Sequence, residues 1–244
     1  MHSSNKKVLH VSVEGGIGVG KSTVLSRLKT LIGNLNGVEF VDEPVHEWVE
    51  HGFLQHMYDN SLNKCAFQHL VLMSLAADFG KAIVYKNPSI VITERSPVSN
   101  YHVFAKENLK GIELEAYHFV WNRFMSVSPE HVQSHYVYLD AHVSSLVHRR
   151  TTRNRDGEAD ISLEYMQAIH KRHTEWINSE ANGITVDANA PGEAVFEQVC
   201  TEIVKLIESH CPQGLENDEV LWSAHKCLQS AVSGSDTPTT IIPS

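Results

Sequence analysis

The sequence has few cysteines, no long apolar run and no excess of basic charge, and each scarcity excludes a class of protein. Its 244 residues include 4 cysteines, which have neither the paired spacing of a zinc site nor the density of a disulfide scaffold. We interpret them as reduced thiols of a cytoplasmic protein. No apolar run approaches membrane-spanning length, and the N-terminal MHSSNKK lacks the apolar core of a signal peptide. We therefore expect no membrane partner.

Basic residues are outnumbered by acidic ones. The 20 Lys and Arg against 29 Asp and Glu give a net charge of −9. A protein that binds nucleic acid regardless of sequence carries a broad basic surface, so we expect no nucleic-acid partner and only a local cationic site. Histidine is frequent, and His131 and His135 could share one helical face. Helical spacing without a carboxylate cluster or a cysteine partner is a weak metal signal, so we predict no histidine metal site.

The strongest functional signal is the stretch 8–23, VLHVSVEGGIGVGKST. An apolar run rich in β-branched residues precedes a glycine-rich turn and a helical pattern, which predicts strand, loop and helix. The spacing of two glycines and Lys-Ser matches the phosphate-binding loop, whose backbone N–H groups and helix N-terminus face an oligophosphate. The predicted nucleotide-binding residues here are Gly15, Gly18, Gly20, Lys21, Ser22 and Thr23.

Two residues at the end of this loop carry its chemistry. Lys21 is predicted to reach the β- and γ-phosphates as a catalytic cation, and Ser22 to give its hydroxyl to magnesium. ATP and Mg²⁺ are therefore the expected cofactors. The dinucleotide motif GxGxxG is not completed, because Gly16, Gly18 and Gly20 are followed by Lys21. A turn built only to relieve steric strain does not explain the Lys-Ser pair.

Short apolar strands alternate with helical patterns along the chain. This alternation predicts an α/β fold with a parallel sheet, helices on both faces and ligands at the carboxyl ends of the strands. Together with the phosphate-binding loop it indicates a P-loop kinase fold with an arginine-rich lid. The five strands are predicted at residues 8–13, 38–41, 89–93, 135–140 and 184–189.

The length fits one domain and a tail. We expect a kinase domain over residues 1–210 and an acidic, Ser/Thr/Pro-containing tail over 211–244, in which only VLWSAHKCL looks helical. The composition of this tail predicts a mobile segment or an added contact segment.

A phosphate-binding loop alone fits kinases, GTPases and motor-type ATPases. A GTPase would carry an NKxD element, but the only Asn-Lys pair, Asn63-Lys64, is followed by Cys65 and Ala66. A kinase acting on a hydroxyl needs a carboxylate base, a magnesium ion and cations that neutralise the transferred group. The residues outside the loop therefore decide between these classes.

Acidic residues at the strand ends are candidates for two of these requirements. Glu43 follows the second strand and is placed to be the base, although an ordinary solvated acid before Pro44 fits the spacing equally well. Glu94 and Asp140 both end apolar strands, and each could support magnesium. We prefer Glu94, because Arg95 follows it directly and could touch phosphate.

Arginines are concentrated after the fourth strand. Arg149, Arg153 and Arg155 lie at i, i+4 and i+6, with no acid between residues 149 and 155. A solvated helix face would mix acids among them, whereas a phosphate clamp uses the planar, permanently charged fork of arginine. This segment is predicted to be a lid that accelerates phosphoryl transfer by roughly 10³ to 10⁵.

Several motifs follow one another in the order and spacing of one family. They are EGGIGVGKST, EPVHEW, AFQ, ERSPVSNYHVFAKENL, RRTTRNRDGE and LEYMQAIHKRHTEW. Over residues 7–208 the chain resembles the deoxynucleoside kinases, which comprise deoxycytidine, deoxyguanosine and mitochondrial thymidine kinases and the insect multisubstrate enzyme. The resemblance implies ATP-dependent phosphorylation of the 5′-hydroxyl of a deoxynucleoside, in nucleotide salvage and DNA precursor synthesis.

The resemblance also implies roles for individual residues. Glu43 would be the general base on the 5′-hydroxyl, and Arg95 would hold the same region and the phosphoryl group. Gln68 would read the Watson–Crick edge of the base, and residues 187–190, beginning with Asp187, would lie beside the adenine of ATP. Other implied contacts are Tyr58 and Glu158 at the sugar 3′-hydroxyl, Phe67 and Phe104 on the faces of the base, and Trp48 in the pocket wall. Without the resemblance, these last three aromatic residues would be assigned to the core.

The chain departs from the family pattern at the base-reading end. Asn100-Tyr101 replaces an acidic or small residue followed by arginine. Val71 and Leu75 replace the small residue and the arginine of deoxycytidine kinases, as in the thymidine-accepting members. An apolar corner can accept a 5-methyl group, so we hypothesise a pyrimidine preference with thymidine included. The family also suggests a homodimer through the helices predicted at 62–84 and 111–126.

Two other functions remain open. A nucleoside monophosphate kinase of the thymidylate type would need more cations than Arg95 to hold the acceptor phosphate. A phosphate-loop protein that signals or scaffolds without phosphorylating a small molecule would have no use for Glu43 or the lid arginines.

Overall fold

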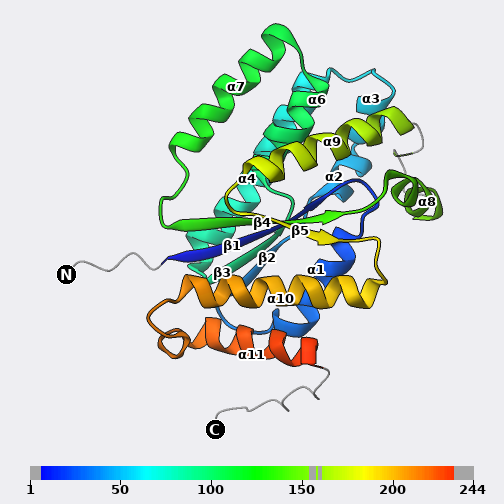
Figure 1. Ribbon diagram of the computed structural model, residues 1–244. Coiled ribbons are helices and arrows are strands. Elements are labelled where there is room, and N and C mark those ends of the chain that lie inside the picture. Colours follow the sequence, from blue (N-terminus) through cyan, green and yellow to red (C-terminus); the bar gives the residue numbers. More distant parts are fainter. Residues whose placement is uncertain (1–6, 154–157, 159–160, 234–244) are drawn as a thin grey trace.

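A five-stranded, fully parallel sheet organises the chain in the computed structural model, which describes residues 7–153, 158 and 161–233. The strand order is β2-β3-β1-β4-β5 (Figure 1). The predicted α/β architecture with a flanked parallel sheet is confirmed. The strands are β1 (Val8–Gly15), β2 (Val38–Val41), β3 (Ile90–Glu94), β4 (Val132–Asp140) and β5 (Gly183–Asp187).

Strand β1 is the central strand and is buried along its whole length. Its Val11 is paired with Ile92 of β3 on one side and with His135 of β4 on the other. Because successive side chains of a strand point to opposite faces, Leu9, Val11 and Val13 enter one core while His10, Ser12 and Glu14 face the other layer. The glycine-rich loop is thereby fixed at the carboxyl end of the middle strand.

Helices cover both faces of the sheet (Figure 1). One face packs against α1 (Lys21–Ile32), α10 (Gly192–His210) and α11 (Glu219–Ser233). The other face packs against α4 (Lys64–Lys86) and α9 (Leu163–Ser179), and α7 (Gly111–Ser126) packs on α4. The remaining helical segments are α2 (Val45–Glu50), α3 (Phe53–Tyr58), α5 (Pro97–Ser99), η1 (Asn100–Ala105), α6 (Lys106–Asn108) and α8 (Val143–Arg153). A short turn, η2 (Leu215–Asn217), connects α10 to α11.

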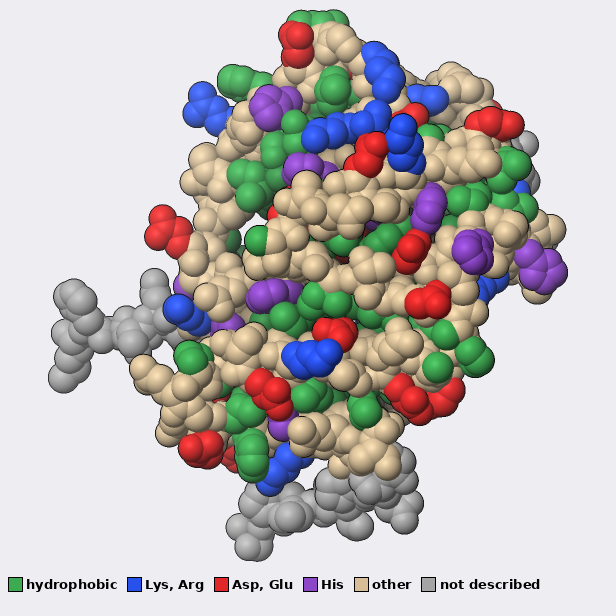
Figure 2. All heavy atoms as spheres, viewed as in Figure 1, with side chains coloured by type: hydrophobic (Ala, Val, Ile, Leu, Met, Phe, Trp, Pro, Cys, Tyr) green, Lys and Arg blue, Asp and Glu red, His purple; other side chains and the backbone are tan. Residues whose placement is uncertain are grey.

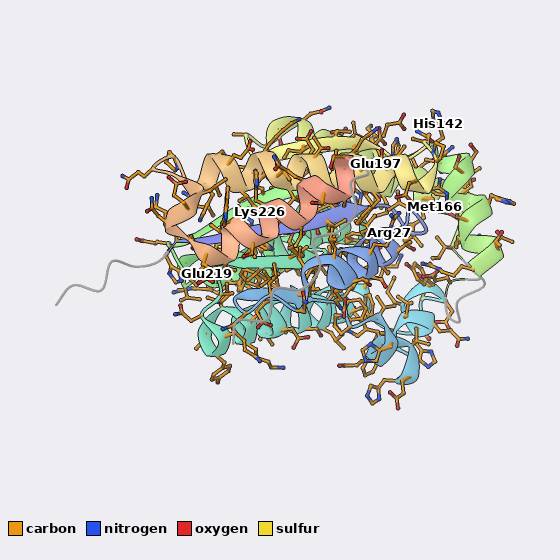
Figure 3. All side chains as sticks on the ribbon, turned by 90° about the horizontal axis from the view of Figure 1, so that it is seen from below. Arg27, His142, Met166, Glu197, Glu219 and Lys226 are labelled. Carbon is orange, nitrogen blue, oxygen red and sulfur yellow. The ribbon has the colours of Figure 1, made fainter. Side chains whose placement is uncertain are left out.

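Helix α11 decides between the two alternatives for residues 219–233 of the tail, which form an added contact segment and not a mobile one, while residues 234–244 lie outside the described residues. Leu221, Ala224 and Leu228 are buried in the same hydrophobic cluster as α1 and α10. Glu219 and Lys226 mark its outer side (Figure 3). Three apolar residues at i, i+3 and i+7 form the stripe that a helix buries against a core, so residues 219–233 belong to the folded domain.

Truncating the buried stripe of α11 tests this packing. We expect Leu228→Ala to lower the free energy of unfolding by about 2–4 kcal/mol, because it deletes a fully buried side chain and leaves a cavity. Gln229→Ala, at the exposed neighbouring position, is the matched control. Urea unfolding followed by circular dichroism measures both, and equal midpoints for the two variants would contradict the packing.

Helix α4 is long and apolar. It has 23 residues, and an 18-residue window of it has a mean hydropathy of 1.2, so by length and composition it could span a membrane, which differs from the expectation that no apolar run approaches that length. The core helix of a soluble protein has the same composition, and Leu72, Leu75 and Ile83 of α4 are buried against the rest of the fold. This helix alone therefore does not define a membrane segment.

Charged side chains of both signs are interspersed over the described residues on the face seen in Figure 2. Arg95 and two arginines of α8, Arg149 and Arg153, line one cavity.

Candidate active site

A cavity of about 570 Å³ lies at the carboxyl ends of the strands, where the alternation of strands and helices predicts the ligand site. The phosphate-binding loop and α10 border one end, and α2, α3 and α4 border the other. Most of the predicted site residues line it: Gly15, Gly18, Gly20, Lys21, Ser22, Thr23, Glu43, Trp48, Tyr58, Phe67, Gln68, Val71, Glu94, Arg95, Asn100, Phe104, Arg149, Arg153 and Glu158.

The phosphate-binding loop has the conformation that its glycines permit. Gly15 has φ +146°, and a Cβ there would lie 2.8 Å from a Val19 methyl carbon and 2.9 Å from the Leu139 carbonyl oxygen. Gly20, at φ +111°, directly precedes α1. The Lys21 ammonium donates to the carbonyl oxygens of Gly15 and Gly16, at 3.1 and 3.4 Å. The lysine thus lies folded against the loop whose N–H groups would hold phosphate.

Ser22 and Glu94, the two predicted magnesium ligands, are in direct contact. The Ser22 hydroxyl donates to Glu94 Oε1 at 2.9 Å. Burial raises the pKa of Glu94, and the nearby Lys21 ammonium opposes this rise. Among the described residues no group of three or more His, Cys, Asp and Glu side chains could hold a metal. A hydroxyl beside one carboxylate fits Mg²⁺, which keeps several waters and takes few protein ligands.

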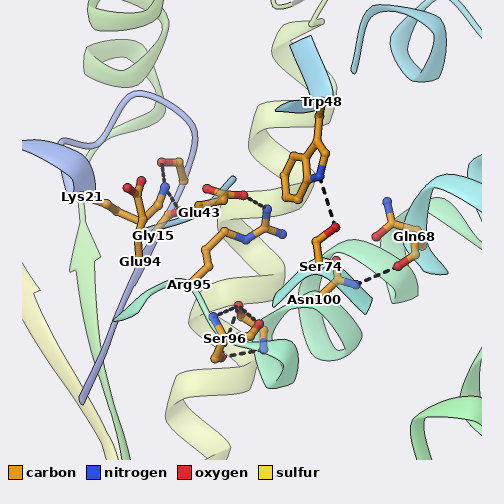
Figure 4. A network of polar contacts seen from close by, with 12 residues as sticks. Gly15, Lys21, Glu43, Trp48, Gln68, Ser74, Glu94, Arg95, Ser96 and Asn100 are labelled. Atoms are coloured by element: carbon orange, nitrogen blue, oxygen red, sulfur yellow. Dashed lines mark hydrogen bonds and ion pairs between the residues drawn. The ribbon is translucent and has the colours of Figure 1, made fainter. Parts of the chain in front are cut away.

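Glu43 forms an ion pair with Arg95, and both side chains are 8% exposed. Glu43 is therefore not the ordinary solvated acid that its position before Pro44 also allowed. Arg95 adopts φ +62°, in the left-handed region that costs free energy outside glycine. This conformation places its guanidinium 3.7 Å from the centre of the Phe104 ring, against which it stacks. The pair joins the two ends of the cavity (Figure 4).

Glu14 is a fully buried carboxyl of β1 that was not predicted from the sequence. Nothing in its sequence neighbours distinguishes it from an ordinary residue of a strand. Ser12 and Ser96 both donate to its Oε1, at 2.7 and 2.6 Å, while Oε2 has no partner among the described residues. Ser96 also caps the helix that follows Arg95. Glu14 therefore ties the central strand to the segment that carries Arg95.

The ionisation of Glu14 makes stability depend on pH. Burial raises its pKa in the folded state, against the opposing effect of the serine hydrogen bonds. The folded protein is therefore most stable while the Glu14 carboxyl is protonated, below the pKa of about 4.3 that a glutamate has in the unfolded chain. This stability is lost as the pH rises through the higher pKa of Glu14 in the folded protein. We expect Glu14→Gln, which cannot ionise, to become more stable relative to the wild type as the pH rises above about 4.3, by about 1.4 kcal/mol in the free energy of unfolding per unit of pKa shift, and melting temperatures across the pH range measure the gain. Glu50→Gln, at an exposed site, is the control, and parallel pH profiles for wild type and Glu14→Gln would refute it.

The lid helix α8 is bound to the loops beneath it through its arginines. Arg149 donates to the carbonyl oxygens of Val19 and Ala188, at 3.2 and 3.0 Å. Arg153 forms an ion pair with Glu158. Arg149 and Arg153 therefore line the cavity as predicted, and Arg155 lies outside the described residues.

Aromatic side chains form the walls of the acceptor end. Trp48 and Phe67 meet edge to face, with ring centroids 6.0 Å apart. Phe104 also borders the cavity. All three residues are buried, and they line the cavity as the resemblance implies instead of lying only in the core. Tyr58 meets Tyr165 edge to face at 5.9 Å. Burial raises the pKa of Tyr58 well above its usual range, which keeps its hydroxyl available as a donor.

Amide groups border the end of the cavity farthest from the loop. Gln68 and Asn100 are both buried there, and Asn100 Nδ2 donates to the main-chain oxygen of Gln68 at 3.1 Å. Val71 lines the cavity, but Leu75 does not and packs behind it with Leu54. The apolar corner predicted from Val71 and Leu75 is thus formed at the cavity surface by Val71.

The nucleotide-base end contains residues that the motifs did not reveal. Arg27 lies 3.8 Å from the centre of the Phe196 ring and is paired with Glu193. Asp187 is not among the residues that line the cavity, and it accepts a hydrogen bond from the Asn189 backbone at 2.9 Å. The adjacent Ala188 does line the cavity. Arg27 and Phe196 lie 169 positions apart in the sequence, so only the folded structure shows that they are neighbours.

The phosphate-binding loop, the adjacent acid and arginine and the aromatic pocket define a phosphate-loop kinase with two adjoining subsites. A family model described as deoxynucleoside kinase matches residues 11–212. The chain belongs to the deoxynucleoside kinase family. It is accordingly a phosphotransferase that acts on deoxynucleosides and uses a nucleotide donor, and the two alternative functions are not favoured.

Relatives from viruses and animals support the family assignment. The thymidine kinase of Ictalurid herpesvirus 1 (strain Auburn) is 30% identical over 201 residues, which cover 77% of this chain and 82% of the relative. Human deoxycytidine kinase is 28% identical over 207 residues, which cover 72% and 77%. A solved structure of deoxyadenosine kinase from M. mycoides, with products dCMP and a flexible dCDP bound, aligns with a TM-score of 0.65 at 21% identity, over 80% of this chain and 99% of that one. The last match supports the fold.

Proposed function

We propose that the protein transfers the γ-phosphoryl group of ATP to the 5′-hydroxyl of a pyrimidine deoxynucleoside, with thymidine among its substrates. One observation carries the proposal: a single cavity has the phosphate-binding loop at one end and the Trp48, Phe67 and Gln68 pocket at the other, with the Glu43–Arg95 pair between them. In-line transfer needs donor and acceptor bound side by side in this way.

Glu43 takes the proton of the 5′-hydroxyl in this proposal. Its carboxylate is held by Arg95, which orients it and remains beside the phosphoryl group as a cation. Tyr58 and Glu158 hold the sugar hydroxyl, and Gln68 reads the base edge. The pocket position of all three supports these roles.

Magnesium would be held by Ser22 and Glu94, whose contact at 2.9 Å fits a shared ion. The ion supplies charge neutralisation at the phosphate oxygens when bound. Lys21, Arg149 and Arg153 supply fixed cations around the same end of the cavity, and Arg155 is proposed as a further lid cation.

A nucleoside panel with ATP and magnesium tests the proposal. We expect turnover of pyrimidine deoxynucleosides, measured by ADP release and by the monophosphate formed. Offering dTMP beside thymidine separates this activity from a nucleoside monophosphate kinase. A purine deoxynucleoside that exceeds every pyrimidine in kcat/KM by about tenfold would overturn the pyrimidine preference, because the pocket contacts proposed here could not produce that ratio.

A homodimer through α4 and α7 is part of the proposal. Both helices carry exposed apolar side chains among the described residues, which supports a covered surface: Met73, Val84, Tyr85, Ile112, Phe119 and Met125. A light-scattering mass equal to one chain would contradict it. Cytoplasmic localisation stays a prediction, supported by the four free thiols.

A further inference from the structure

Arg95 has a main-chain conformation that needs support from its surroundings. Its φ of +62° lies in the left-handed region, where a residue other than glycine stays only if the neighbouring structure enforces it. Its side chain pairs with Glu43 and stacks on Phe104, but Arg95 Nε has no hydrogen-bond partner among the described residues. Contacts of the guanidinium alone therefore do not account for the conformation, and the main chain on either side of Arg95 has to be held.

Strand β1 holds the chain on both sides of this torsion. Before it, the Arg95 N–H donates to the carbonyl oxygen of Val13 at 3.1 Å. After it, the Ser96 hydroxyl donates to Glu14 Oε1 at 2.6 Å. In Figure 4, Ser96 lies below Arg95 and Glu43 lies above it. The N–Cα bond about which φ turns lies between these two attachment points, so consecutive residues of β1 restrain it together.

Glu14 can act as an anchor because its own position is fixed. It is 0% exposed and is paired with Tyr138 of β4 inside the sheet. Ser12 donates to the same Oε1 at 2.7 Å, and one oxygen can accept two hydrogen bonds whether or not the carboxyl is ionised. Neither Glu14 nor Ser96 is among the residues that line the cavity, so any effect on the reaction has to pass through a residue that does.

Resting on the proposed deoxynucleoside kinase function, we propose that Glu14 is a positioning residue for phosphoryl transfer and acts through Ser96 on Arg95. The bond to Ser96 keeps Arg95 in the left-handed region and its guanidinium beside Glu43. Without this bond the Arg95 main chain relaxes to a more favourable conformation, and the guanidinium leaves the place from which it orients the base. A displacement of about 1 Å in an active site can cost on the order of 10² in rate, so a carboxyl that touches no substrate governs turnover.

The two serines that donate to Glu14 provide a matched pair of variants. Ser96→Ala removes the bond that restrains Arg95, whereas Ser12→Ala removes a bond to the same oxygen that does not reach Arg95. We expect Ser96→Ala to lower kcat by about tenfold or more, while each KM stays within about threefold, because the interaction lost is one made in the transition state. Ser12→Ala should keep kcat within about threefold of the wild type. Equal kcat values for the two variants overturn the inference.

Ser96 also caps α5, and a double-mutant cycle separates the cap from the bond to Glu14. Glu14→Ala combined with Ser96→Ala should lower kcat no further than the larger single loss, because both substitutions remove the same bond. Multiplied losses would assign the effect to the cap and overturn the role of Glu14. Glu14→Gln keeps an oxygen that can accept from Ser96, so its kcat should stay within about threefold of the wild type. A loss in Glu14→Gln as large as in Glu14→Ala refutes the hydrogen-bond mechanism.

Arg95→Lys tests whether the effect passes through Arg95. In this background the positioned guanidinium is absent, so adding Ser96→Ala should change kcat by less than about threefold, and a further tenfold loss overturns the transmission through Arg95. If Glu14→Ala does not fold, the comparison of Ser96→Ala with Ser12→Ala still decides the inference. Full kcat in Ser96→Ala overturns this inference alone and leaves the kinase function standing. Failure of the wild type to phosphorylate any deoxynucleoside overturns the proposed function and the inference with it.

Discussion

Glu43→Gln will lose on the order of 10² to 10⁴ in kcat, the usual contribution of a positioned base. The substitution keeps the size of the side chain and an oxygen that can accept from Arg95, but it removes the group that takes the hydroxyl proton. Since the Glu43 side chain is 8% exposed and bound to Arg95, the variant should keep its place in the cavity wall. Nucleoside binding is expected to persist while turnover falls.

Steady-state kinetics with the preferred nucleoside measures the turnover of Glu43→Gln, and the thermal shift caused by the nucleoside alone measures binding. Asp42→Asn is the matched control, because it makes the same chemical change at the preceding residue, where Asp42 pairs with Lys29 on the exposed surface. Turnover of Glu43→Gln equal to that of Asp42→Asn would remove Glu43 from the role of base.

Lys21→Met is expected to lower kcat/KM for ATP on the order of 10² to 10³, the usual cost of removing one preorganised charge from a site of developing negative charge. Lys21 is 9% exposed, and its ammonium lies at the loop carbonyls of Gly15 and Gly16. A phosphate would take the place of these carbonyls as the partner of the charge. Methionine keeps the length of the side chain and loses the charge.

Lys29→Met, on the same helix α1, is the control for Lys21→Met. Its ammonium pairs with Asp42 at the surface, where such pairs contribute about 0–1 kcal/mol to stability. Initial rates at varied ATP concentration, with melting temperatures of both variants, separate a donor-site defect from unfolding. The prediction is wrong if Lys21→Met retains more than about a tenth of the wild-type kcat/KM, since less than 1.4 kcal/mol would then depend on the charge.

The elements that local sequence determines were predictable, and those that depend on distant partners were not. Strand, loop and helix around Gly15 and Lys21 are encoded in consecutive residues, so their geometry follows from the motif. The pairing of Glu43 with Arg95 joins residues 52 positions apart, and only the fold distinguishes it from a solvated acid. The left-handed conformation of Arg95 likewise has no signal in its own neighbours.

Residues whose role depends on packing were the hardest to foresee. Glu14 follows the pattern of a strand, and its significance comes from Ser96, which lies 82 positions away. The orientation of the Asn100 amide requires Tyr117 from another helix. The helical pattern VLWSAHKCL was recognised in the sequence, but its place in the core was not, because a stripe as narrow as that of Leu228 and its neighbours is convincing only when the surface beneath it is known.

The ion pairs of the two acidic residues beside the acceptor lead to an expectation about ionic strength. Glu43 is paired with Arg95, and Glu158 with Arg153, so an uncharged nucleoside enters a region whose charges are already compensated. ATP instead brings several negative charges to Lys21 and Arg149. Added salt screens charged encounters and leaves neutral ones nearly untouched. We therefore expect the KM for ATP to rise with salt while the KM for the nucleoside stays constant, which makes ionic strength a means of separating the two halves of the cavity in kinetic experiments.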